Sequence, residues 1–169
     1  KAMADLYVRS FPTPTMQTIV LRYCDIYGPR VRWMGENTSV VIKFICQALN
    51  DETITIHGDG SQTRKFIYTE DVAKANIVVA ESDFPPSRDP YVFNVGGCET
   101  INLRELASMI IELTGSKSNI EYTGSFRQGD VTEAISDCGL ITEMIGWKPS
   151  YLFREGLVQT IESIRKQMK

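Results

Sequence analysis

The sequence predicts an α/β fold in which short strands alternate with helices. Two segments, residues 17–23 and 91–95, are apolar and rich in β-branched and aromatic side chains, which is typical of buried strands. Both are flanked by stretches in which apolar residues recur at helical spacing. Because parallel strands need a crossover connection, buried strands separated by helices indicate a parallel sheet.

The helices are predicted from apolar spacing and from residues that favour helix ends. Residues 1–10 carry three apolar side chains at helical spacing before two prolines, so we expect the first helix there. Further helices are expected over 39–50, 69–82, 102–114, 137–145 and 153–167. Their ends are marked by the expected N-caps Ser39, Thr69 and Asn102 and by the terminal glycines Gly115 and Gly146.

The rest of the chain is predicted as short strands and loops. Residues 53–56, 65–68 and 120–122 are brief β-rich stretches. A loop is expected over 24–38, because Gly28, Pro29 and Gly35 interrupt any regular pattern there. There are no internal repeats and no low-complexity tracts.

Composition narrows the class of protein. The 169 residues are 43% hydrophobic and 23% charged, which is typical of a globular chain with one real core. A net charge of −3 does not indicate the basic surface that binds nucleic acid or an anionic membrane. No apolar run in the sequence has the length of a membrane span or the pattern of a signal peptide. Four cysteines form no C-x-x-C pair, so we expect reduced thiols in a cytoplasmic protein. The single histidine, His57, argues against a histidine-based zinc site.

A glycine-rich segment ending in arginine carries the main functional signal. Residues 58–64 read Gly-Asp-Gly-Ser-Gln-Thr-Arg and stand directly before an apolar strand. Glycines let backbone N–H groups approach an anion, and the guanidinium of Arg64 matches phosphate oxygens. The alternative is a surface hairpin in which Gly-Asp-Gly merely turns the chain.

Four other segments stand in a fixed order around this one: 21–30 (LRYCDIYGPR), 91–97 (YVFNVGG), 127–130 (RQGD) and 145–149 (IGWKP). Together the five segments resemble the extended short-chain dehydrogenase/reductase family, the NAD-dependent sugar-nucleotide epimerases and dehydratases. The likeness runs from residue 1 to about residue 165 and matches the second half of such an enzyme. Within the family, the motifs resemble those of UDP-glucose 4-epimerases most.

The resemblance implies a division of the chain into two parts. Residues 1–35 and 65–100 would be the C-terminal part of a Rossmann-type parallel sheet, the remnant of an NAD-binding domain. Residues 36–64 and 101–169 would form a small mixed α/β substrate-binding lobe that includes the helices at 39–50, 102–114 and 137–145. The glycine-rich cofactor turn of the family is absent from this sequence, because the only G-x-G, at residues 58–60, does not open a helix.

The same resemblance suggests residues on the cofactor side. Lys1 aligns with the family's catalytic lysine, which binds the nicotinamide ribose and lowers the pKa of a tyrosine four residues earlier. The alternative for Lys1 is a solvated terminal lysine. Tyr23 and Cys24 fall where the family places backbone near the nicotinamide. The cofactor implied is NAD in the full-length enzyme, and we expect this chain alone to bind it weakly and to be inactive.

The substrate side is predicted around two arginines. Arg64 and Arg127 match the pair that clamps the sugar-nucleotide diphosphate, and Asp130 would contact a sugar hydroxyl or orient Arg127. Asp25 stands where the family has an asparagine; it would accept from sugar hydroxyls or, alternatively, cap a turn. The predicted walls of the site, which could equally be plain core residues, are Val40, Val41 and Phe66.

The implied function is catalysis on a UDP- or dTDP-hexose, in which the sugar is oxidised at C4, altered as a keto-sugar and reduced again. A UDP-hexose 4-epimerase is the first expectation, and a 4,6-dehydratase or UDP-glucuronate decarboxylase shares almost all of the motifs. An alternative of another class is a non-catalytic nucleotide-sugar-binding module or an inactive fragment. We expect a homo-oligomer, because buried strands without their usual neighbours invite pairing with another chain.

Overall fold

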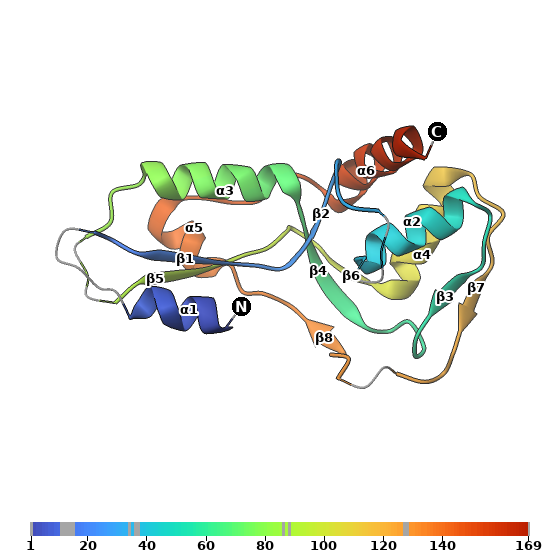
Figure 1. Cartoon of the computed structure of the whole chain (residues 1–169), viewed down its shortest axis with the longest axis horizontal. Coiled ribbons are helices and arrows are strands. Elements are labelled where there is room, and N and C mark those ends of the chain that lie inside the picture. The colour runs from blue at the N-terminus through green and yellow to red at the C-terminus, as the bar shows by residue number, and fades with distance from the viewer. Residues whose placement is uncertain are drawn as a thin grey trace.

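The computed structural model describes residues 2–10, 16–33, 35, 38–85, 87, 89–126 and 129–168. The chain forms an elongated α/β structure whose regular elements gather at two ends, with β4 running between them (Figure 1). One end holds α1 (Ala2–Arg9), β1 (Ile19–Tyr23), α3 (Thr69–Glu81), β5 (Tyr91–Val95) and α5 (Gly139–Ile145). The other end holds α2 (Val40–Leu49), β3 (Ile54–Ile56), α4 (Leu103–Thr114), β7 (Ile120–Tyr122) and α6 (Phe153–Gln167).

The predicted parallel strands are confirmed. β1 and β5 pair in parallel, with Ile19 opposite Tyr91 and Tyr23 opposite Val95. β4 (Thr63–Tyr68) pairs in parallel with β2 (Asp25–Tyr27) and β8 (Glu133–Ala134), and antiparallel with β6 (Thr100–Asn102). β3 and β7 form a separate parallel pair. The strand β4 therefore joins segments from three distant parts of the chain.

Several short strands differ from the prediction. The expected loop over 24–38 contains β2, and neither β6 nor β8 was predicted. The hairpin alternative for residues 58–60 is wrong, because β3 pairs with β7 and β4 with other strands. Strands of two or three residues show too little alternation to be read from sequence, and only their distant partners define them.

Local capping signals are only partly confirmed. At the start of α4 the Asn102 side chain accepts from the Glu105 N–H at 2.8 Å, while Glu105 accepts from the Asn102 N–H at 3.2 Å. By contrast, the Ser39 hydroxyl makes no cap hydrogen bond and is buried without a partner. The prediction for Thr69 is also wrong, because Thr69 is the first residue of α3 and Tyr68 precedes it as N-cap.

The buried side chains form two clusters, one at each end. The larger cluster joins α2, α4 and α6 to β3 and to Phe66 and Tyr68 of β4. The smaller cluster joins Phe93 and Val95 of β5 to α3 and α5. Helix α5 therefore packs on the parallel strands through Ile141, and not with α2 and α4 as expected for 137–145. The proposed domain boundaries themselves stay a prediction.

No helix in the described ranges is long and apolar enough to cross a membrane.

Candidate functional site

Arg64 and Asp130 meet beside β4. Arg64 Nη2 donates to Asp130 Oδ1 at 2.7 Å, and Arg64 Nη1 donates to the Thr63 carbonyl at 2.9 Å. The Arg64 side chain is 13% exposed and the Asp130 side chain 23% exposed, so the guanidinium is shielded while Asp130 lies at the surface. Asp130 lies shortly before β8, and the pairing of β8 with Thr63 and Arg64 brings that segment to β4. The partner of Asp130 in the structure is thus Arg64.

A small pocket of about 140 Å³ opens at this ion pair. Arg64 and Asp130 line it from β4 and the segment before β8, and Val40 lines it from the first turn of α2. Apolar and polar groups share its wall, which is the composition expected of a ligand pocket. The full lining is Val40, Lys43, Phe44, Thr55, Ile56, His57, Arg64, Leu103 and Asp130.

Two charged or titratable side chains of this pocket were not predicted as site residues. Lys43 lies one turn after Val40 on the same face of α2, and that spacing is the sequence signal that could have found it. His57 stands directly before Gly58, and its carbonyl accepts from Gln62 Nε2 at 2.6 Å. The pocket therefore combines two cationic side chains with one carboxylate and one imidazole.

The other predicted walls lie in the core. Val41 and Phe66 are 1% and 3% exposed and line neither this pocket nor the groove described below. The Phe66 ring packs against Phe153, with ring centroids 5.2 Å apart, and edge-on against Tyr27 at 6.4 Å. Of the three candidates, the structure brings only Val40 to Arg64.

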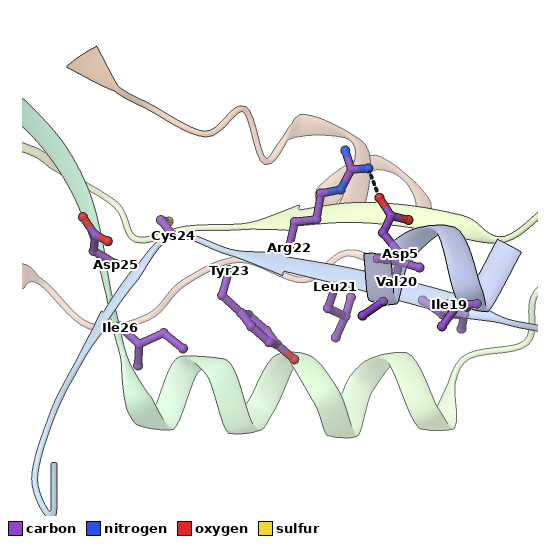
Figure 2. Close-up of a pocket in the computed structure, with 11 residues that line it drawn as sticks. Asp5, Ile19, Val20, Leu21, Arg22, Tyr23, Cys24, Asp25 and Ile26 are labelled. Atoms are coloured by element: carbon purple, nitrogen blue, oxygen red, sulfur yellow. Dashed lines mark hydrogen bonds and ion pairs between the residues drawn. The ribbon is translucent and has the colours of Figure 1, made fainter. Parts of the chain in front are cut away.

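The cofactor-side candidates Tyr23 and Cys24 lie in a second hollow together with Asp25, which was predicted on the substrate side and does not line the Arg64 pocket. A groove of about 760 Å³ runs along α1 and β1 and continues to Ile26 in β2 (Figure 2). Tyr23, Cys24 and Asp25 line it where β1 passes into β2, and Tyr23 points toward α3, where its hydroxyl donates to Asn76 at 3.0 Å. Across the groove Arg22 forms an ion pair with Asp5 of α1.

The Cys24 thiol is partly buried beside this groove. Burial raises its pKa above the ordinary range, and the neighbouring backbone of Gly97 opposes that shift. Cys24 Sγ donates to the Val95 carbonyl at 3.3 Å, so the side chain points toward β5. Two further candidates, Lys1 and Arg127, lie outside the described residues.

The described residues do not fit the diphosphate of NAD. A dinucleotide site needs a glycine turn that opens a helix with free backbone N–H groups. After β5, a Cβ on Gly97 would lie 1.9 Å from the Phe66 carbonyl oxygen, and one on Gly96 would lie 2.6 Å from Cys24 Sγ. These two glycines serve internal packing and are not part of a dinucleotide turn. No cluster of three His, Cys, Asp or Glu side chains suited to a metal occurs among the described residues.

Comparison with known proteins decides the family. The NAD dependent epimerase/dehydratase family matches residues 1–96, more than half of the chain. This chain belongs to that family. The resemblance predicted from the five motifs is thereby confirmed at family level, as is the use of NAD in the family.

Individual members of the family agree with this assignment. The low-salt glycan biosynthesis protein Agl12 of Haloferax volcanii is 34% identical over 165 residues, which are 96% of this chain and 50% of that protein. UDP-glucuronic acid decarboxylases of Arabidopsis thaliana and a UDP-glucuronate 4-epimerase of Thermodesulfobacterium geofontis are also relatives. The chain spans half or less of the length of these relatives.

Solved structures confirm the fold. The UDP-glucose 4-epimerase of Thermotoga maritima with UDP-glucose superposes with a TM-score of 0.89 at 33% identity, covering 100% of this chain and 53% of that one. The UDP-glucuronic acid 4-epimerase of Bacillus cereus, in complex with UDP-glucuronic acid and NAD, gives 0.83 at 25% identity, covering 98% and 50%. The Rossmann-type α/β fold class predicted from sequence is correct.

Proposed function

We propose that this chain is the substrate-binding part of an NAD-dependent sugar-nucleotide epimerase, with a UDP-hexose 4-epimerase as the first candidate. The observation that carries the proposal is Arg64, a shielded guanidinium at the wall of a pocket. Arg64 uses two of its five N–H donors on Thr63 and Asp130, which leaves donors for a second anion. Family membership makes a nucleotide diphosphate the natural anion.

The shape and charge of the pocket support a diphosphate there. A volume of about 140 Å³ is below the range of whole-ligand pockets, so it suits part of a nucleotide sugar. Lys43 adds a second positive charge on the same wall. We assign Asp130 to holding the Arg64 guanidinium in place, and Arg127 to a second contact with the diphosphate.

The test is calorimetric titration of UDP, UDP-glucose and UDP-glucuronate into the chain and its variants. A charge-assisted phosphate contact contributes about 1.5–3 kcal/mol, so Arg64→Ala and Arg127→Ala should each weaken binding about tenfold or more. Arg154→Ala is the matched control, because Arg154 of α6 forms an exposed ion pair with Glu112 of α4, away from the pocket lining. Unchanged affinity in both site variants, or an equal loss in the control, would refute the diphosphate clamp.

Two sets of alternatives share this binding site. A UDP-glucuronate decarboxylase is favoured by relatives of that activity, and a 4,6-dehydratase shares the same motifs. Product analysis separates the enzymes: an epimerase gives an isomer of the same mass, a decarboxylase releases carbon dioxide, and a dehydratase releases water. A non-catalytic nucleotide-sugar-binding module would bind UDP-sugars and give none of these products.

We propose that the 169-residue chain alone has no turnover and binds NAD only weakly. The reason is that no glycine turn opening a helix is present to hold the dinucleotide. Titration of NAD into the purified chain should give no saturable binding in the micromolar range. Micromolar or tighter binding would contradict this assignment.

We also propose that a second copy of the chain covers the exposed face of α1. Met3, Leu6 and Tyr7 are 81%, 63% and 67% exposed and lie at helical spacing, so they form one apolar stripe. Light scattering should give a dimer or higher assembly that Leu6→Glu weakens. Leu140→Glu changes an equally apolar exposed residue of α5 and should leave the assembly intact. A monomer at high micromolar concentration would contradict the proposal.

A further inference from the structure

Cys24 and Cys138 are brought together by the fold, although they are far apart in the chain. Cys24 directly follows β1, and Cys138 stands directly before α5. A Cβ built on Gly96 would lie 2.6 Å from Cys24 Sγ and 3.1 Å from Cys138 Sγ. The two sulfurs therefore flank one point, and their separation cannot exceed the sum of these distances. Because Gly96 has no side chain, it puts no atom between the two sulfurs.

Neither thiol is committed to another strong partner. All four cysteines lie in described parts of the chain, and all are free thiols. Cys24 Sγ donates to the Val95 carbonyl at 3.3 Å, and Cys138 Sγ makes a long contact of 3.7 Å to the Ser136 carbonyl. Thiol donors are weak, so rotation of either side chain costs little hydrogen-bond energy. Both residues are partly exposed, which gives a small oxidant access to them.

We propose that Cys24 and Cys138 form a dithiol site that small-molecule disulfides oxidise to an intramolecular disulfide. The two partly exposed sulfurs lie on either side of Gly96, close enough that rotation of the side chains can bring them together, and no metal cluster occurs in the described residues. The link would join the end of β1 to the start of α5.

Lys65 distinguishes the two thiols. Its ammonium group donates to the Ser136 carbonyl at 3.2 Å, and its stem passes beside Gly96. Burial raises the pKa of both thiols, but the positive charge of Lys65 opposes this shift for Cys138, whereas the proximity of Cys138 adds to it for Cys24. The positive charge of Lys65 beside Cys138 favours Cys138 as the attacking thiolate, with Cys24 as the resolving thiol.

The exchange balances with oxidised glutathione as the two-electron oxidant. The Cys138 thiolate attacks one glutathione sulfur, so a mixed disulfide forms and one glutathione thiolate leaves. Cys24 then loses its proton to solvent and attacks the Cys138 sulfur. The bond between Cys24 and Cys138 forms, the second glutathione thiolate leaves, and the protein dithiol has lost two electrons and two protons.

The test is incubation of the chain with oxidised glutathione at about pH 8.5, followed by intact mass and peptide mapping without reduction. We expect a mass loss of two hydrogens and a single linked peptide pair that contains Cys24 and Cys138. Cys46→Ser and Cys98→Ser should behave as the unchanged chain. Cys24→Ser and Cys138→Ser should form no intramolecular bond, and Cys24→Ser should instead retain a stable glutathione adduct on Cys138.

Two further measurements keep the proposal falsifiable if a serine variant folds poorly. The oxidised chain should melt at least about 5 °C above the reduced chain, because the bond closes a long loop. Lys65→Gln should slow the reaction several-fold at about pH 8, and Lys65→Arg should restore it. Linkage through Cys98 or Cys46, disulfides between two chains only, or failure of both sulfurs to react would overturn the proposal.

Discussion

Asp71 is a buried carboxylate that joins the two ends of the molecule. We expect its replacement to lower the free energy of unfolding, and to lower it more for alanine than for asparagine. It lies in the first turn of α3 and is 1% exposed. Asp71 Oδ2 accepts from the Ser150 and Tyr151 N–H groups, both at 3.0 Å, and Oδ1 accepts from Ser150 Oγ at 2.6 Å. These residues lead directly into α6, so one side chain ties α6 to α3.

The expected cost follows from the donors that each variant leaves behind. Asp71→Ala removes the acceptor of two backbone N–H groups and one hydroxyl. At about 1 kcal/mol or more for each unsatisfied donor, it should lower the free energy of unfolding by about 3–4 kcal/mol. Asp71→Asn keeps one oxygen for the two N–H groups, and its amide can donate to the Ser150 hydroxyl. It loses only the assistance of the charge, about 1–1.5 kcal/mol.

Urea unfolding and thermal unfolding, both followed by circular dichroism, measure the free energy and the melting temperature of each variant. For a chain of this size about 1 kcal/mol corresponds to roughly 2–4 °C in melting temperature, so the alanine variant should melt about 10 °C lower and the asparagine variant about 3 °C lower. Asp83→Ala is the control, because Asp83 is exposed just beyond the same helix. A cost for alanine below about 1 kcal/mol, or an asparagine variant as unstable as alanine, would refute this account.

Two further predictions test local contacts. The Tyr151 hydroxyl donates to Glu70, which raises the pKa of Tyr151 to about 12. Because the phenol of Tyr151 loses its proton less readily in the folded chain, it stabilises the fold fully below about pH 10, and this stabilisation is lost as the pH rises toward 12. Tyr151→Phe should therefore make the free energy of unfolding fall less between about pH 10 and 12 than it does in the unchanged chain. Tyr122→Phe is the control and should leave this fall unchanged. Gly97→Ala should lower the free energy of unfolding by about 3 kcal/mol or more, because its Cβ would meet the Phe66 carbonyl at 1.9 Å. Gly115→Ala has open space around its Cβ but a φ of 68°, so it should lower the free energy of unfolding by only about 1–2 kcal/mol. Chemical denaturation measures both.

Sequence reasoning succeeded where the determinants are local. Asn102 and Glu105 stand three residues apart, and the capping box they form depends on little beyond that spacing. The parallel pairing of β1 and β5 follows from two strongly apolar segments and the helices between them. Ser39 is also a favourable N-cap residue, but Ile42 stands where Glu105 completes the capping box of α4, and the Ser39 hydroxyl is buried without a partner. The local signal at Ser39 is therefore weaker than the one at Asn102.

The candidate site divides in the same way. Arg64 was predictable because a glycine-rich segment precedes it directly. Its ion pair with Asp130 depends on the two-residue strand β8, which no periodicity reveals. His57 directly follows β3 and Lys43 lies on α2, so their joint position at the pocket requires the packing of α2 on β3. The sequence therefore supplied the charged group, and the fold supplied its surroundings.

Consecutive residues of β4 explain how one strand serves two sites. Side chains alternate between the faces of a strand, so Arg64 and Lys65 point in opposite directions. Arg64 holds Asp130, whereas Lys65 holds the Ser136 carbonyl, two residues before Cys138. Both contacts fall on the one segment that contains β8 and leads into α5. Because β4 anchors that segment at both ends, a change at the Cys24–Cys138 pair and a change at the Arg64 pocket act on the same short stretch of chain.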